Sequence, residues 1–221
     1  MTVVFSDVRG AAPVDAAAAR SLYRAGGKRV LDLVLILLAA PFVLPLVAVL
    51  AGIVALGGGQ PFYLQDRIGR GGRIYRIWKL RTMVPDAEAR LAAHLAADPA
   101  ARAEWDRTQK LRCDPRVTPV GRFLRRTSLD ELPQLWNVVT GDMSLIGPRP
   151  MMVDQKPLYP GVAYYALRPG ISGPWQVSDR NATAFADRAA YDDSYLREMS
   201  LATDIRLILA TFRAVARGTG C

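Results

Sequence analysis

Two adjacent carboxylates lie within residues 128–133, which read Ser-Leu-Asp-Glu-Leu-Pro. The acids are Asp130 and Glu131, and three basic residues precede them: Arg122, Arg125 and Arg126. An ionised aspartate can attack phosphorus, and a neighbouring acid can hold a divalent cation that neutralises a diphosphate. Arginine guanidinium groups suit phosphate oxygens. The pattern therefore predicts chemistry on a phosphorylated substrate, with Asp130 and Glu131 as catalytic candidates and Glu131 as the metal ligand.

A purely structural interpretation of the same residues stays open. Ser128 and Glu131 have the spacing of a capping box before an apolar helical stretch, so Ser128 would cap the helix and Glu131 would reach back to it. Asp130 would then be a favourable acid in the first turn. Because a helix N-terminus attracts anions and keeps a carboxylate ionised, the same geometry also suits catalysis.

The elements that must position these residues begin with a long apolar run. No charged residue occurs between Leu33 and Leu56, and a helix of that length can cross a bilayer. Pro41 and Pro45 fall near its centre, where each removes an amide donor and clashes with the preceding turn. A kinked helix that enters one leaflet and returns is therefore predicted, and an ordinary proline-kinked span is the alternative.

Basic residues flank the apolar run on both sides. Those before it are Arg20, Arg24, Lys28 and Arg29, and those after it are Arg67, Arg70, Arg73, Arg76, Lys79 and Arg81. Basic flanks stay in the cytoplasm. Both ends of the run are therefore predicted to face the cytoplasm, which favours re-entry over crossing.

The composition points to an anionic partner and to a membrane. The chain has 221 residues with 29 basic and 20 acidic side chains, a net charge of +9, and 51% hydrophobic residues. Such a basic excess suits nucleic acid, anionic lipid or a phosphorylated substrate, and the long apolar run favours the membrane over nucleic acid. Cys113 and Cys221 form no CxxC pair and are predicted to be free thiols. Residues 1–19 lack the order of a signal peptide and are predicted to be a mobile tail.

Short elements follow the apolar run. Gly57–Gly59 ends the helix, and residues 61–64 and 73–78 flank a glycine cluster and predict a β-hairpin. Residues 85–109 are helical in pattern and are divided at Pro99. His94 within them has no metal-binding partners nearby and is interpreted as a surface or packed residue.

The C-terminal part contains an amphipathic helix and several turns. Its apolar residues recur at helical spacing and are Leu201, Ile205, Ile208, Phe212 and Val215. This stripe is predicted to pack on the core, with anionic lipid as the alternative. Three turns that each carry an arginine, at residues 147–150, 168–170 and 179–181, suggest an anion site built from loops.

Several motifs in order resemble the bacterial sugar transferases, the monotopic phosphoglycosyl transferase family. They are Lys28-Arg29-x-x-Asp32, Gln65-x-Arg67-x-Gly69, Lys79-x-Arg81-Thr82-Met83, residues 127–134, Gly141-Asp142-Met143-Ser144, Gly147-Pro148-Arg149-Pro150 and Arg168-Pro169-Gly170-Ile171. The resemblance covers residues 28–215. The chain departs from the family pattern at one position. The family often has a Ser-Pro pair where the membrane helix breaks, and the matching residues here are Leu44-Pro45.

The resemblance implies an activity and roles for residues. It implies transfer of a sugar 1-phosphate from a UDP-sugar to undecaprenyl phosphate, with release of UMP, at the start of exopolysaccharide assembly, and it favours galactose or glucose. Asp130 would be the nucleophile, and Glu131 would help to bind Mg²⁺. The candidates for phosphate contact are Lys79, Arg81, Arg125, Arg149 and Arg180.

The sequence thus predicts a membrane-associated α/β enzyme on the cytoplasmic face of the bacterial inner membrane. Its expected parts are the tail at 1–19, a basic flank and re-entrant helix broken at Pro41 and Pro45 at 20–59, and a small catalytic domain at 60–221 with a β-hairpin and amphipathic helices. No nucleic acid is expected as a partner, and a homodimer is left open. The alternative is a non-enzymatic membrane adaptor with a basic face for lipid or nucleic acid, which would have no use for the Asp-Glu pair.

Overall fold

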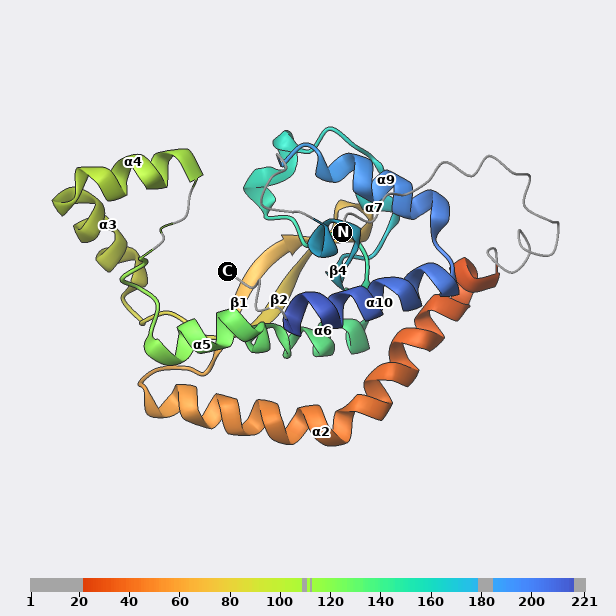
Figure 1. The fold of residues 1–221 in the computed structure, drawn as a ribbon, viewed down its shortest axis with the longest axis horizontal. Coiled ribbons are helices and arrows are strands. Elements are labelled where there is room, and N and C mark those ends of the chain that lie inside the picture. Colours follow the sequence, from red (N-terminus) through yellow and green to blue (C-terminus); the bar gives the residue numbers. More distant parts are fainter. Residues whose placement is uncertain (1–21, 109–110, 112, 179–184, 217–221) are drawn as a thin grey trace.

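One long apolar helix dominates the N-terminal part of the fold. The computed structural model describes residues 22–108, 111, 113–178 and 185–216. A π-helical turn (Tyr23–Gly27) leads into α2 (Lys28–Leu56), which contains both prolines and ends where Gly57 follows. The helix bends near its middle (Figure 1), as expected where two prolines remove amide donors. It is the one helix in the described part of the chain that is long and apolar enough to cross a membrane.

Both halves of α2 pack against the same folded body. In the first half, Ile36 contacts the core cluster that contains Ile77 and Val138. In the second half, Leu50 belongs to another cluster, with Leu80 and Leu124. Most of the side chains between these contacts are exposed, among them Phe42 at 79%. The bend of α2 therefore presents apolar surface that no other described part of the chain covers.

A β-hairpin follows α2, as predicted. Strand β1 (Phe62–Ile68) pairs antiparallel with β2 (Ile74–Leu80), and Arg67 lies opposite Tyr75. Both strands extend beyond the predicted stretches. The 3-10 turn between them (Arg70–Gly72) contains two glycines with positive φ, which side chains rarely adopt. The hairpin carries Arg70 at its tip and Lys79 near its other end.

Further helices and a second small sheet follow the hairpin, and the first two of these helices lie apart from it at one side of the molecule (Figure 1). The helices are α3 (Ala87–Ala97), α4 (Pro99–Thr108), α5 (Pro119–Thr127), α6 (Gln134–Thr140), α7 (Ala163–Ala166), α8 (Pro174–Val177), α9 (Arg188–Glu198) and α10 (Leu201–Ala216), with 3-10 turns at Leu129–Glu131 and Val153–Leu158. Strands β3 (Ser144–Ile146) and β4 (Gly170–Ser172) pair in parallel. The helical region divided by a proline is confirmed, and the fold mixes helices and strands as predicted.

Most of the apolar stripe predicted on the last helix is exposed, and of its five residues only Ile208 packs against a core cluster. Leu201 and Phe212 are 51% and 69% exposed. The inward face of α10 carries instead Asp204 and Leu207, which are 1% and 4% exposed. Thr211 adds a hydrogen bond to Ser172 across 2.6 Å. The prediction of core packing is therefore wrong for four of the five residues, because polar contacts of Asp204 and Thr211 help to decide which face turns inward.

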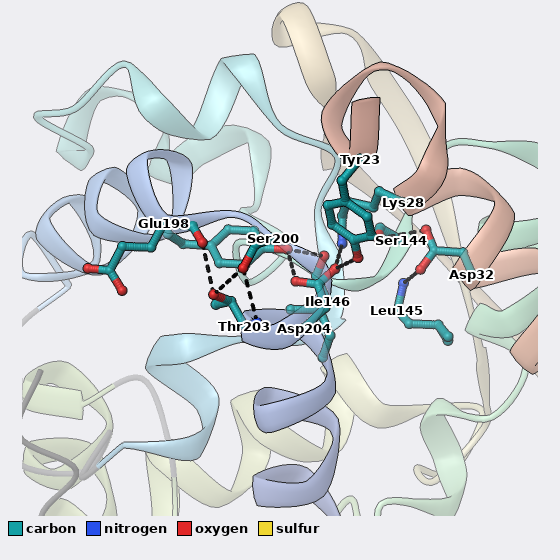
Figure 2. Close-up of polar contacts among 11 residues, drawn as sticks. Tyr23, Lys28, Asp32, Ser144, Leu145, Ile146, Glu198, Ser200, Thr203 and Asp204 are labelled. Atoms are coloured by element: carbon teal, nitrogen blue, oxygen red, sulfur yellow. Dashed lines mark hydrogen bonds and ion pairs between the residues drawn. The ribbon is translucent and has the colours of Figure 1, made fainter. Parts of the chain in front are cut away.

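A buried polar network joins the start of α2 to α10 and β3 (Figure 2). The carboxylate of Asp204 accepts hydrogen bonds from Tyr23 at 2.5 Å, Lys28 at 2.6 Å and Tyr195 at 2.6 Å. One turn further along α2, Asp32 accepts a bond from the hydroxyl of Ser144 at 2.8 Å. These contacts anchor the polar beginning of the apolar helix to the folded body.

Candidate active site

The turn that carries the two carboxylates has an unusual backbone. Helix α5 ends at Thr127, and Ser128 adopts the left-handed conformation with φ 56° as its C-cap. The 3-10 turn Leu129–Glu131 follows directly. The side chain of Ser128 makes no capping hydrogen bond, so the predicted capping box is absent. A non-glycine residue in this conformation costs free energy and often marks a functional turn.

Glu131 forms an ion pair with Lys79, a residue of β2. Nζ of Lys79 lies 2.8 Å from Oε1 of Glu131, and both side chains are less than one quarter exposed. Burial alone would raise the pKa of Glu131, but the charges of Lys79 and Arg149 and hydrogen bonds from Lys79 and Gln134 lower it below its ordinary value. Glu131 is therefore ionised at neutral pH.

Asp130 is the more buried member of the pair. It is 9% exposed, and burial raises its pKa to about 6, although the charges of Lys79 and Arg125 oppose that effect. The sequence predicted that a helix N-terminus keeps this carboxyl ionised. That explanation is wrong, because Asp130 lies in a buried 3-10 turn. The carboxylate is still the main form above pH 6, with less solvation than an exposed acid.

The structure brings three of the predicted phosphate-contact residues to the carboxylates. Lys79 contacts Glu131 directly. Arg125 lies close enough to Asp130 for their charges to interact, and its Nε donates to the hydroxyl of Thr82 at 2.9 Å. Arg149 lowers the pKa of Glu131. The carboxylates therefore lie in a positively charged environment that suits a diphosphate.

Two predicted contacts are not placed at the carboxylates. The guanidinium of Arg81 lies beside Gly59, where an added Cβ would meet its Nη1 at 2.7 Å. Arg81 therefore borders the turn that follows α2. Arg180 lies outside the described residues. A phosphate-binding role remains a prediction for both arginines.

A second group of arginines adjoins the site around Trp175. The guanidinium carbons of Arg188 and Arg149 lie 4.1 Å and 5.7 Å from the centre of the Trp175 ring. Burial, followed by the charge of Arg149, lowers the pKa of Arg67 and brings that of Arg188 to about 10. Mutual repulsion of this kind is reduced when an anion binds.

Several polar atoms in this group are buried and have no hydrogen-bond partner among the residues that the structure describes. They are Nε of Arg67, Nε of Arg188 and both amide atoms of Gln176. Unsatisfied buried polar atoms are uncommon and often mark a binding site. The sequence prediction missed Arg188 and Gln176. A lone arginine at the start of a helix has no local sequence signal, and the pattern of residues 173–176 indicates only a turn.

The donor set of the two carboxylates fits Mg²⁺. Asp130 and Glu131 supply hard oxygen ligands, and Mg²⁺ is commonly held by one or two carboxylates together with substrate phosphates. No group of three or more metal-binding side chains occurs among the described residues. A metal held here would therefore be shared with a phosphorylated substrate.

Comparison with known proteins gives consistent similarities. The model of the bacterial sugar transferase family matches residues 23–218. The chain is 45% identical over 195 residues to the UDP-galactose-lipid carrier transferase of Erwinia amylovora, covering 87% of this chain and 41% of that protein. Identity to the undecaprenyl-phosphate galactose phosphotransferase of Salmonella typhimurium is 43%, with the same coverage. The exopolysaccharide production protein ExoY of Sinorhizobium fredii is 41% identical, and 87% of each chain is covered. The chain thus spans about two fifths of the length of the first two relatives.

Proposed function

The chain belongs to the bacterial sugar transferase family, and on that basis we propose that it transfers a sugar 1-phosphate from a UDP-sugar to undecaprenyl phosphate. The products are undecaprenyl-diphosphate-sugar and UMP. The observation that carries the proposal is the buried Asp130 and the half-buried Glu131 beside it, among Lys79, Arg125 and Arg149. Two of the relatives are named for galactose transfer, which favours galactose over glucose as the sugar.

The reaction proceeds in two displacements at one phosphorus atom. An oxygen of the Asp130 carboxylate attacks the β-phosphorus of the UDP-sugar, and the bond from that phosphorus to the oxygen shared with UMP breaks. The electron pair leaves with UMP, and an acyl phosphate that carries the sugar remains on Asp130. An oxygen of the lipid phosphate then attacks the same phosphorus, and the carboxylate is restored. Positive side chains stabilise the charge that develops on the phosphoryl oxygens.

Each neighbouring residue has a distinct part in this scheme. Arg125 lies near Asp130 and favours its ionised form. Arg149, beside Glu131 and over Trp175, binds the diphosphate. Lys79 orients Glu131, and Mg²⁺ held by Glu131 would neutralise diphosphate charge when bound.

We also infer that the protein is attached to the cytoplasmic face of the inner membrane by α2 as a re-entrant helix. The packing of both halves of α2 on one body supports this topology, because a straight span would separate them by a bilayer. The exposed apolar residues near the bend would enter the lipid. The division into an anchor at 20–59 and a catalytic domain at 60–221 remains part of this proposal, as does a homodimer.

A direct assay tests the function. Purified protein is incubated with undecaprenyl phosphate and a panel of UDP-sugars, and UMP release and lipid-linked product are measured. We expect turnover with at least one UDP-hexose and none with the Asp130→Asn variant. If the protein binds lipid but releases no UMP with any sugar, the membrane adaptor becomes the better account, because an adaptor would tolerate that substitution.

A further inference from the structure

A second polar cavity lies at the tip of the β-hairpin. Its volume is about 580 Å³, and it is formed by the turn after β1, the start of β2 and the segments that follow α6 and α7. The side chains that line it are Arg70, Arg73, Tyr75, Asp142, Tyr165 and Arg168. None of these residues has a part in the scheme above. Tyr75 and Lys79 are four residues apart on β2, which separates them by roughly 13 Å at about 3.3 Å per residue, so the cavity is distinct from the Asp130–Glu131 site.

Positive charge in this cavity exceeds negative charge. Asp142 is its one acid, and it is paired with Arg73 at 2.9 Å. Arg168 donates from Nε to the backbone oxygen of Gly141 at 2.9 Å. Neither Arg168 nor Arg70 forms an ion pair within the described part of the chain. The cavity therefore holds cationic groups without a compensating carboxylate.

A further arginine, Arg29 at the start of α2, lies beside the cavity without lining it, and its guanidinium donates to the backbone oxygens of Val138 and Val139. A Cβ added to Gly141, which lines the cavity, would lie 3.8 Å from Nη2 of Arg29. Burial lowers the pKa of Arg168, and the charges of Arg70 and Arg29 lower it further. Crowded arginines repel one another, and this repulsion is relieved when an anion binds between them.

Tyr75, one of the residues that line the cavity, carries a buried hydroxyl group. Tyr75 is 7% exposed, and its phenolic oxygen has no hydrogen-bond partner among the described residues. A buried tyrosine hydroxyl is normally paired. An acceptor oxygen bound nearby would satisfy this donor.

We propose that this cavity binds a phosphate group, with Arg70 and Arg168 as the main ligands. Phosphate fits better than carboxylate because several guanidinium groups converge, and each can bind phosphate oxygens in pairs. Arg29 is the second residue of α2, so the cavity lies close to the beginning of the apolar helix. The phosphate can therefore come from an anionic phospholipid headgroup or from a soluble phosphate.

Three variants of the full chain, with Arg149→Ala as a comparison at the Asp130–Glu131 site, separate this site from other basic surfaces. Arg70→Glu reverses one of the unpaired charges at the exposed tip of the hairpin. Tyr75→Phe removes only the unpartnered hydroxyl, so the fold is retained. The matched control is Arg76→Glu, because Arg76 is exposed on the same strand but does not line the cavity.

Two binding measurements distinguish the sources of phosphate. Native mass spectrometry of the detergent-purified protein counts bound phosphatidylglycerol, with phosphatidylcholine as the uncharged comparison. Titration with inorganic phosphate, followed by the rise in Tm, measures the soluble source. We expect Arg70→Glu to weaken binding at least about tenfold in one of these measurements, Tyr75→Phe to weaken it less, and Arg76→Glu to match the wild type.

The pattern of loss identifies the ligand or overturns the proposal. Loss of one bound phosphatidylglycerol assigns the site to a lipid headgroup, and loss of the phosphate-dependent rise in Tm assigns it to a soluble phosphate. Wild-type behaviour of Arg70→Glu and Tyr75→Phe in both measurements would overturn the proposal. So would phosphate binding that disappears only in Arg149→Ala, because that result places the anion at the Asp130–Glu131 site.

Discussion

Lys79 donates a hydrogen bond from Nζ to Oε1 of Glu131 at 2.8 Å, and so connects strand β2 to the turn that carries both carboxylates. The two residues are 52 positions apart in the chain. The pair keeps Glu131 ionised although that side chain is half-buried, and it places a cation beside Asp130 as well. The hairpin therefore holds the turn of the candidate active site in place.

The nucleophile is tested without the lipid acceptor. Wild-type protein should release at most about one UMP per active site and gain the mass of a sugar phosphate, because covalent catalysis needs no acceptor for its first step. Asp130→Asn should do neither, because an amide is a poor nucleophile. Intact-protein mass spectrometry and UMP quantification provide the measurement. No burst and no adduct in the wild type would indicate direct attack by the lipid phosphate.

The acidity of Asp130 predicts a pH dependence. Its pKa is raised to about 6, so the rate of the UMP burst should fall about tenfold per pH unit below that value and level off above it. Because the folded pKa lies above the unfolded one, the ionised acid lowers stability as the pH rises through this interval. Rapid-quench measurements between pH 5 and 8, with circular dichroism at each pH, test this. A flat rate down to pH 5 would exclude Asp130 as the titrating nucleophile.

Glu131 and Lys79 should affect catalysis more than folding. Glu131→Gln is expected to cut turnover severely and to raise the Mg²⁺ concentration needed for half-maximal rate, because the ligand loses its charge. Loss of the ion pair should lower the free energy of unfolding by only about 1 kcal/mol. Lys79→Met is the matched variant at the other end of the pair. Near-normal UMP release by Glu131→Gln would show that the pair is structural.

The topology of α2 can be read by cysteine labelling. In a background without Cys113 and Cys221, single cysteines at Leu22 and Gln60, both exposed positions beyond the ends of the helix, should resist a membrane-impermeant thiol reagent in intact cells. Labelling of one position alone would show a full crossing. Replacing Pro41 and Pro45 with alanine should favour that crossing, because an unbroken apolar helix of this length spans a bilayer.

The network at Asp204 should stabilise the protein strongly. Its carboxylate pairs with Lys28, and their side chains are 1% and 14% exposed. Asp204→Ala leaves that ammonium group and two tyrosine hydroxyls unpaired, which should lower the free energy of unfolding by about 3–5 kcal/mol. Asp106→Ala, which breaks an exposed pair with Arg102, is the control and should change it little. Urea unfolding in detergent measures both, and equal effects would contradict a central role for Asp204.

Local features of the sequence were sufficient for much of the fold. The glycines after Leu56 and the proline at 99 mark boundaries that the structure confirms, because these residues act through their own backbones. The hairpin follows from two β-rich stretches around a glycine turn. The Asp-Glu pair and the ordered motifs indicated the family, which the comparisons show. These signals depend on neighbours in the chain and can be read without coordinates.

Tertiary structure alone decided the environment of the site. The left-handed Ser128 removed the capping box, and burial raised the pKa of Asp130 when the local pattern predicted an acid kept ionised by a helix end. Arg188 lies at the site because it contacts Trp175, and no pattern in the sequence predicts that contact. Most of the apolar stripe of α10 faces outward because buried partners of Asp204 turn the other face inward. Periodicity shows that a helix has two faces, whereas the contacts of distant residues determine which one is covered and which charges are desolvated.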